Sequence, residues 1–288
     1  MGYLKSKESW MHFVNTLQHT QELTEKKQAK QLLYQAIETA LKNKIKPSTG
    51  ILFSGGIDST FVAYLAQKLG YSLPCYTVGF EDAPDLQSAR KLAKQYQFNV
   101  KEIILTQEVL QATIKKVIKI LKTSDFVKVG IGCLMYLACE KAKKDGIKVL
   151  LTGAGTEDTL CGYEKHLQAY RENRLQEEIK QGLLSLWDRD FSRDFPIAAY
   201  HQVQVDSPYL DETYIRTAMK IHNSLKINEE HKKFILREIA VDKGLNKEFA
   251  FRKKKAAQYG SRIEREIGKI ARKKGYKYKA EYLQSLIL

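Results

Sequence analysis

The chain has 288 residues, which is enough to bury a substantial core and to form one large or two modest domains. Its 43% hydrophobic and 28% charged residues, with no apolar run near the roughly 18 residues that span a membrane, predict a cytoplasmic globular protein without a membrane partner. The net charge of +15 makes nucleic acid a candidate partner, although lysine-rich helix faces are commonly only solvated, so this partner is the less favoured one.

Two helices are predicted before the first strand. Residues 6–24 carry apolar side chains near a 3.6-residue period, and residues 25–44 carry an apolar stripe with lysines opposite. We expect residues 1–28 to form an N-terminal helical extension and residues 29–288 to form the main domain.

From residue 50 strands and helices alternate. Strands are expected at residues 51–53, 72–80, 99–105 and 148–151, and helices at residues 60–69, 84–96, 108–121 and 132–144. This rhythm predicts an α/β fold, a parallel sheet with helices on both faces in residues 47–163, with ligands beyond the carboxyl ends of the strands. After Tyr163 the strand signal stops, and residues 164–288 are expected to form a helical half that shares one core with the sheet. The helices expected there cover residues 167–181, 183–187, 211–225, 229–243 and 261–273.

Residues 50–60, G-I-L-F-S-G-G-I-D-S-T, read as a strand, a glycine turn and a helix start. Glycines let the backbone approach a phosphate, and the N–H groups and dipole of the following helix favour negative charge. Ser54, Ser59 and Thr60 add hydroxyl donors, whereas Asp58 suits the site only if Mg²⁺ lies between it and the phosphate. No lysine follows the glycines, so γ-phosphoryl transfer of the G-x-x-x-x-G-K-S/T type is not expected. The alternative is an ordinary strand-to-helix turn with serine caps.

A second motif covers residues 151–166, L-T-G-A-G-T-E-D-T-L-C-G-Y-E-K-H. Gly153 and Gly155 open the backbone at a strand end, and Glu157 and Asp158 place two carboxylates beside it. Acids within reach of Asp58 would suit Mg²⁺, which needs oxygen ligands. The alternative is a helix N-terminus that carries acids for its dipole.

A third motif covers residues 251–261, F-R-K-K-K-A-A-Q-Y-G-S. Four consecutive cations usually form a solvated face, but this run ends in Gln258, Tyr259, Gly260 and Ser261, which is unlike a simple charged surface.

Together the three motifs resemble the synthetase domain of the asparagine synthetases, within the ATP pyrophosphatase superfamily, over about residues 30–266. In that family S-G-G-x-D-S holds pyrophosphate, a G-x-G-x-D-E-x-x-x-G-Y stretch supplies acids, and a late lysine precedes A-x-Q-Y/F-G-S. Residues 77–80 match the strand whose backbone meets adenine. The pattern is closest to the asparagine synthetase domain-containing branch, which lacks the glutaminase half.

The resemblance implies an adenine nucleotide alpha hydrolase-like fold with ATP and Mg²⁺ as cofactors. The nucleotide-binding residues that it implies are Leu52, Ser54, Gly55, Gly56, Asp58, Ser59, Thr60, Val78, Gly79 and Gly153. The implied catalytic residues are Lys254, with Lys253 or Lys255 as alternatives, Glu157 and Asp158, and the implied metal ligands are Asp58 and Glu157.

The sequence departs from the family pattern at positions that concern the nitrogen donor and the carboxylate substrate rather than ATP. Too few residues precede Ser54 to build a glutaminase domain, so we expect ammonia to arrive free or from a separate amidotransferase partner. Ala154 stands where asparagine synthetases carry a catalytic glutamate, and residues 157–158 reverse the D-E order. Gln204 and Asp206 occupy the positions of a glutamate and an arginine. The ATP end is therefore preserved while the acid-substrate end is altered.

The expected function is an AMP-forming carbon–nitrogen ligase. A small-molecule carboxylate attacks the α-phosphate of ATP, pyrophosphate leaves, and ammonia or an amine attacks the acyl-adenylate; a homodimer is a further candidate. One alternative, a tRNA-modifying ATP pyrophosphatase, is favoured by the basic residues 272–279. Another, a degenerate nucleotide-binding scaffold, is suggested by Ala154 and Gln204.

Overall fold

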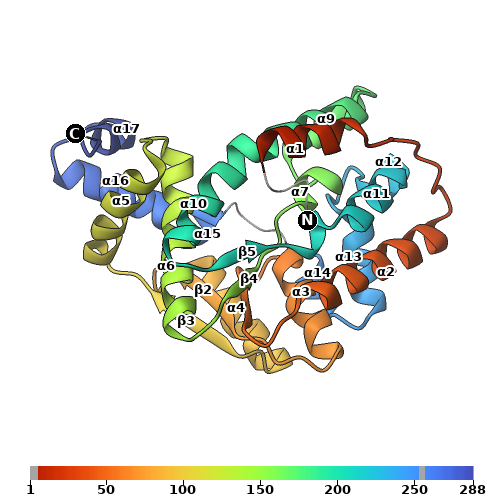
Figure 1. The fold of residues 1–288 in the computed structure, drawn as a ribbon, viewed down its shortest axis with the longest axis horizontal. Coiled ribbons are helices and arrows are strands. Elements are labelled where there is room, and N and C mark those ends of the chain that lie inside the picture. Colours follow the sequence, from red (N-terminus) through yellow and green to blue (C-terminus); the bar gives the residue numbers. More distant parts are fainter. Residues whose placement is uncertain (1–5, 253–256, 288) are drawn as a thin grey trace. The chain divides into compact units, whose positions relative to one another are not determined.

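Five parallel strands form one sheet in the computed structural model, which describes residues 6–252 and 257–287. The strands are β1 (Thr49–Leu52), β2 (Cys75–Gly79), β3 (Val100–Ile104), β4 (Val149–Leu151) and β5 (Gln204–Asp206). Their spatial order is β3-β2-β1-β4-β5 (Figure 1). Ile51 pairs with Cys75 on one side and with Leu151 on the other. The direction of strand addition reverses between β1 and β4, and ligands of open parallel sheets bind beyond the carboxyl ends at such a point.

Helices make up most of the rest of the described chain. They are α1 (Lys7–Asn15), α2 (Lys26–Lys44), α3 (Ile57–Lys68), α4 (Pro84–Tyr96), α5 (Gln107–Leu121), α6 (Phe126–Lys144), α7 (Thr156–Thr159), α8 (Glu164–Arg171), α9 (Leu175–Leu186), α10 (Ser192–Tyr200), α11 (Glu212–Lys220), α12 (Asn223–Lys226), α13 (Phe234–Asp242), α14 (Lys247–Ala250), α15 (Ala257–Gly260), α16 (Ile263–Lys273) and α17 (Lys279–Gln284). A π-helical turn, Trp187–Phe191, joins α9 to α10, and a 3-10 turn, Pro208–Leu210, precedes α11. Within the described residues, no helix combines the length and apolar character that a membrane crossing requires.

Helices cover both faces of the sheet. On one face Tyr76 and Val78 of β2 and Leu150 of β4 join a buried apolar cluster with residues of α5, α6, α10 and α16. α3 and α4 pack against β1, β2 and β3 but supply no residue of this cluster, so they cover the opposite face. Successive strand side chains point to opposite faces, which explains why β2 can be buried along its whole length. This is the adenine nucleotide alpha hydrolase-like architecture that the sequence predicted.

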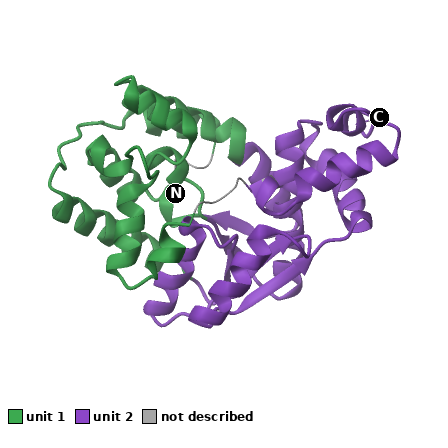
Figure 2. Cartoon of the chain, turned by 180° about the vertical axis from the view of Figure 1, so that it is seen from behind, with its two compact units in different colours: residues 1–45, 153–190, 207–252 green, residues 46–152, 191–206, 253–288 purple. Residues whose placement is uncertain are grey.

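The chain divides into two compact units, each built from three segments (Figure 2). Unit 1 contains residues 1–45, 153–190 and 207–252, and unit 2 contains residues 46–152, 191–206 and 253–288. The whole sheet lies in unit 2, and the named elements of unit 1 are helices and helical turns. The unit boundaries do not coincide with residues 28 and 163, because the chain leaves unit 2 directly after β4 and returns to it for α10 and β5.

The four expected strands are confirmed, but the expectation that no strand follows Tyr163 is wrong. β5 has three residues, too few to show a period-2 pattern, and its position is set by pairing: Gln204 N–H donates to Lys148 O at 2.8 Å and Thr152 N–H to Asp206 O at 2.8 Å. The helix expected over residues 6–24 also ends early, at Asn15. Leu23 instead exchanges backbone hydrogen bonds with the segment after α11, which requires an extended conformation.

Candidate functional site

The glycine loop of unit 2 lies between β1 and α3, at the point where the strand order reverses. Gly56 is the N-cap of α3 and offers no side-chain acceptor to the first helical N–H groups. The loop is held from inside: Ser54 N–H donates to Ser59 Oγ at 3.3 Å, and Ser59 Oγ–H to Gly56 O at 3.4 Å. An uncapped helix N-terminus beside a tightly held loop is suited to an anion such as a phosphate.

Gly55 is the residue that shapes this loop. Its φ of +64° lies in the left-handed region, and an added Cβ would lie 2.6 Å from Ser88 Oγ of α4. Ser88 Oγ–H also donates to Gly55 O at 3.3 Å, so α4 supports the loop from behind. Gly55 therefore occupies a position that disfavours any residue with a side chain, while its predicted approach to a phosphate stays a prediction.

The three polar side chains in the first turn of α3, Asp58, Ser59 and Thr60, are all buried. Asp58 is 6% exposed and Thr60 1% exposed. Thr60 Oγ1 has no hydrogen-bond partner among the described residues, which is unusual for a buried hydroxyl. A carboxylate in the first turn is stabilised by the helix dipole.

The described end of the third motif, residues 257–261, lies in unit 2, against the end of β2. Val78 is buried, Gly79 ends the strand, and the next residue, Phe80, donates its N–H to Ser261 O at 3.2 Å. Gly260 packs against the buried carboxylate of Asp85, where an added Cβ would lie 2.4 Å from an oxygen. Lys253, Lys254 and Lys255 lie outside the described residues, so the prediction for Lys254 stays a prediction.

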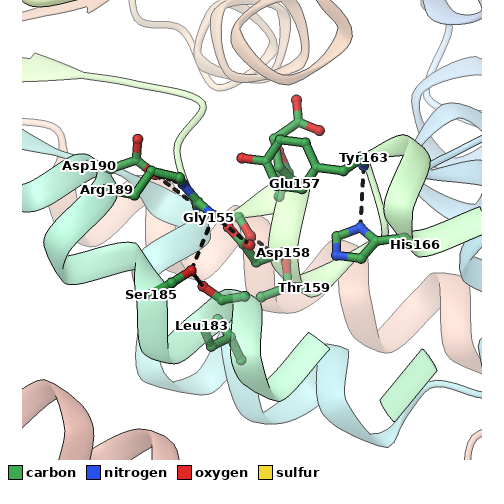
Figure 3. A network of polar contacts seen from close by, with 12 residues as sticks. Gly155, Glu157, Asp158, Thr159, Tyr163, His166, Leu183, Ser185, Arg189 and Asp190 are labelled. Atoms are coloured by element: carbon green, nitrogen blue, oxygen red, sulfur yellow. Dashed lines mark hydrogen bonds and ion pairs between the residues drawn. The ribbon is translucent and has the colours of Figure 1, made fainter. Parts of the chain in front are cut away.

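The acidic motif belongs to unit 1 and forms a polar network with the end of α9 (Figure 3). Gly155 has φ +104°, and an added Cβ would lie 2.6 Å from Tyr209 O. Thr159 Oγ1–H donates to Gly155 O at 2.8 Å, and Thr156 Oγ1–H to Gly153 O at 3.1 Å. These bonds close the short helix α7, which carries both acids.

The two acids of α7 have different environments. Asp158 is 1% exposed and pairs with Arg189, whose Nη2 and Nη1 lie 2.7 and 3.3 Å from its oxygens. Burial raises the pKa of Asp158, and Arg189 opposes that shift. Arg189 also bonds Asp190 at 2.9 Å and lies 5.3 Å from the centre of the Tyr163 ring. Asp158 therefore faces the interior of unit 1 and an arginine.

Glu157 points elsewhere, toward Lys233. Its Oε1 lies 2.7 Å from Lys233 Nζ, and its side chain is 34% exposed whereas that of Lys233 is 5% exposed. Gly162 makes room for the carboxylate, since an added Cβ would lie 1.6 Å from Glu157 Oε2. Lys233 was missed from the sequence, because nothing distinguishes it among the neighbouring lysines of residues 226–243.

Buried polar groups of unit 1 were missed as well. Lys226 is fully buried, burial lowers its pKa to about 8, and its Nζ has no hydrogen-bond partner among the described residues. Burial also lowers the pKa of His166 to about 4, and its Nδ1 accepts the Tyr163 N–H at 3.3 Å.

The residues that depart from the family pattern are placed as follows. Ala154 O accepts a hydrogen bond from Ser207 Oγ at 2.7 Å within unit 1. Gln204 and Asp206 are the two ends of β5 in unit 2, where Gln204 is exposed and Asp206 half-buried. Asp58 and Glu157, the expected metal ligands, belong to different units, and among residues 6–252 and 257–287 no three His, Cys, Asp or Glu side chains form a metal-binding group.

The sheet order, with a glycine loop and a helix N-terminus at the strand reversal, defines an α/β protein of the adenine nucleotide alpha hydrolase-like class. Within that class, the chain belongs to the asparagine synthase family, because the family model described as "Asparagine synthase" matches residues 28–196 and 187–277.

Individual relatives support the same family assignment. The chain is 32% identical to a "Putative asparagine synthetase (glutamine-hydrolyzing) 1" of Methanocaldococcus jannaschii, over 90% of this chain and 55% of that protein. It is 31% identical to asparagine synthetase B (glutamine-hydrolyzing) of Escherichia coli, over 72% of this chain and 40% of that protein. The chain thus spans about half the length, or less, of these relatives. A solved structure, titled as a predicted subunit of tRNA methyltransferase from M. jannaschii, matches 72% of this chain and 93% of its own at 21% identity, with a TM-score of 0.34, too low to support an argument.

Proposed function

We propose that the protein is an ATP-dependent ligase that forms AMP: it activates a small carboxylate as an acyl-adenylate and transfers ammonia or an amine to it. The observation that carries this proposal is the loop after β1, with left-handed Gly55 and the uncapped N-terminus of α3 at the strand reversal. Membership of the asparagine synthase family supports the same chemistry.

The loop favours cleavage between the α- and β-phosphates of ATP. Residues 54–60, S-G-G-I-D-S-T, contain no lysine that could reach a transferred γ-phosphoryl group. Backbone N–H groups and the dipole of α3 would instead hold the leaving pyrophosphate, where negative charge develops. Thr60 Oγ1, which has no partner among the described residues, is a further donor for a phosphate oxygen.

Mg²⁺ fits this loop as an ion shared between protein and substrate. It is commonly bound through one or two carboxylates together with substrate phosphates, so a three-residue protein cluster is not needed. Asp58 suits it, because this carboxylate lies in the first turn of the helix whose N-terminus would hold the phosphates. Glu157, the second ligand that the resemblance implies, is partly exposed. When bound, the ion would neutralise charge on the pyrophosphate.

The cations of the chain complete the proposal. We assign Lys254 to the same developing charge, with Lys253 and Lys255 as alternatives. Lys233, held by Glu157, is a further cation at the acidic motif. Asp158 has a different role, since its pairing with Arg189 leaves it to fix the shape of α7.

The carboxylate substrate is expected to differ from free aspartate. Ala154 cannot accept a proton, and general-base assistance is typically worth about a hundred- to ten-thousandfold in rate. Asp206 adds negative charge where the family pattern has arginine. Nitrogen would come from free ammonia or from a separate amidotransferase.

The test is to incubate the protein with Mg-ATP, ammonia and a panel of carboxylates, and to identify the products by mass spectrometry. Production of AMP and pyrophosphate that depends on one carboxylate supports the proposal. Production of ADP and phosphate contradicts it, and ATP binding without turnover of any carboxylate indicates a nucleotide-binding scaffold instead.

A further inference from the structure

The positive charge of the chain is concentrated in unit 2. Unit 1 has 21 lysines and arginines against 19 aspartates and glutamates, whereas unit 2 has 27 against 14. Their net charges are therefore +2 and +13, which together give the +15 of the chain. The units differ little in their density of cations, since unit 1 has 129 residues and unit 2 has 159. A general preference for lysine does not explain this asymmetry, because unit 2 is distinguished by its scarcity of acids.

Much of this charge lies on adjacent helices. α5 buries Leu110, Ile114, Val117 and Ile118, and its opposite side exposes Lys115, Lys116 and Lys119, followed by Lys122 at the C-cap. None of these four lysines makes an ion pair with a residue that the structure describes. α5 packs against α10 and α16 (Figure 1), and α16 ends in the exposed residues Arg272, Lys273 and Lys274.

Exposed tyrosines occur on helices beside α5. Tyr200 and Tyr278, at 60% and 54% exposure, are the two most exposed large apolar side chains of the described chain. The ring centres of Tyr200, at the end of α10, and Tyr136 are 5.9 Å apart. Lys116 Nζ of α5 lies 5.4 Å from the centre of the Tyr136 ring. His201 packs edge-on against both of these tyrosines.

Tyr278 is the N-cap of α17, which packs against α16 and α6. Lys277 Nζ lies 5.2 Å from the centre of its ring. α17 is joined to the segment after α5 by a hydrogen bond from Ser124 Oγ to Gln284 Oε1 at 2.6 Å. Lys273 Nζ, at the end of α16, donates to Gln107 Oε1 at the start of α5, at 2.7 Å.

We propose that this surface, formed by α10, α5, α16 and α17 of unit 2 and called the α5 surface, binds single-stranded nucleic acid. Lysines without acidic partners attract a phosphate backbone, and exposed aromatic rings beside them provide stacking positions for unpaired bases. The α5 surface combines the four lysines of residues 115–122, which make no ion pair with a described residue, with exposed tyrosines, although Lys269 and Lys279 on α16 and α17 do pair with acids. In unit 1, by comparison, Lys26 pairs with Glu238 and Lys30 with Asp242. This binding is separate from the proposed ligase chemistry, because the glycine loop and the acidic motif contribute no residue to it.

The test uses fluorescence anisotropy with a labelled 20-nucleotide single-stranded RNA and its DNA counterpart, at salt concentrations from 50 to 200 mM. Affinity should fall steeply with salt, because each neutralised phosphate adds about 0.7 to the slope of log K against log salt. The four-lysine variant K115Q/K116Q/K119Q/K122Q should lose at least about tenfold in affinity, and the slope should become shallower by about 3. The matched control K27Q/K42Q/K180Q/K247Q removes the same charge from exposed positions of unit 1 and should bind as the unchanged protein does.

Aromatic variants test the stacking. Tyr200→Ala and Tyr278→Ala should each weaken binding about fivefold or more, whereas the phenylalanine variants should bind normally. The proposal is overturned by no binding at 50 mM salt, by equal losses in the lysine variant and its control, or by phenylalanine variants as weak as the alanine ones. It is also overturned if the lysine variant keeps its affinity for RNA and DNA but loses binding to phosphatidylserine vesicles, which would make the α5 surface a lipid-binding one.

Discussion

Gly55→Ala is the most direct perturbation of the proposed phosphate loop. The substitution adds one methyl group, and the structure places that group 2.6 Å from Ser88 Oγ and 2.9 Å from Ser88 Cβ. It also forces an L-residue with a side chain into a φ of +64°.

Two separable costs follow. The left-handed backbone costs an alanine about 1 to 2 kcal/mol, and overpacking against α4 costs about 1 to 3 kcal/mol more. We therefore expect Gly55→Ala to lower the free energy of unfolding by about 2 to 5 kcal/mol. In the folded fraction, displacement of the loop should lower AMP formation by a hundredfold or more, since misplacing such groups by about 1 Å can cost that much.

Gly70→Ala is the matched control. Gly70 has a φ of +87°, but an added Cβ would have nothing within 4 Å, so this variant should show only the backbone cost and normal activity. Ser88→Gly, combined with Gly55→Ala, removes the contact and should recover the packing part of the loss. Urea unfolding and AMP assays on the four proteins separate these terms. Equal destabilisation by Gly55→Ala and Gly70→Ala, or no recovery in the double variant, would refute the reasoning.

Three further outcomes are expected. Asp58→Asn should leave urea unfolding nearly unchanged but reduce AMP formation about a hundredfold or more, and normal turnover would exclude a metal-ligand role. Lys226→Met should raise the free energy of unfolding at pH 7 by about 3 kcal/mol, since the pKa of Lys226 is 10.5 in the unfolded chain and about 8 in the folded chain. The unchanged protein loses this stability as the pH falls from about 10.5 to 8, whereas the Met variant does not. The stability gained by the substitution should therefore vanish above pH 10.5, and a gain that is constant at all pH values would contradict this reasoning. Ala154→Glu should raise the rate at which asparagine is formed from aspartate and ammonia. If the protein with Ala154 already makes asparagine at about ten per second, another residue must act as the general base.

The strand, glycine turn and helix after residue 48 could be predicted from the sequence because their determinants are local. An apolar strand, two glycines and an apolar-periodic helix follow one another within residues 49–68, and the structure places Gly55, Ser59 and Thr60 as that order requires. The parallel sheet followed from the same kind of signal, repeated along residues 50–151. Each strand there alternates with a helix long enough to show its own period.

What could not be predicted depends on contacts between distant segments. β5 is a strand because β4 offers it hydrogen-bond partners, and Lys233 meets Glu157 across 76 positions of the sequence. Arg189 likewise meets Asp158 across 31 positions, a contact that the sequence did not predict. The division into two units could not be predicted for the same reason. Each unit is assembled from three separate segments of the chain, and no change of composition marks where one segment ends and the next begins.

The two acids of α7 show how much consecutive residues can differ. Successive residues of a helix are about 100° apart, so the two acids face different neighbours. The partly exposed Glu157 faces the buried Lys233, and the buried Asp158 faces the partly exposed Arg189. We expect Glu157→Gln to lower AMP formation about a hundredfold or more while the protein stays folded, because an amide still accepts the lysine hydrogen bond but is a poor ligand for Mg²⁺. Asp158→Asn should do the reverse, costing about 1 to 3 kcal/mol of stability through the weakened bond to Arg189, with turnover of the folded protein within about tenfold. The comparison needs only thermal unfolding and AMP assays of both variants. If Asp158→Asn proves stable but inactive and Glu157→Gln active, the metal ligand is Asp158, and the inward placement of its carboxylate must change when ATP binds.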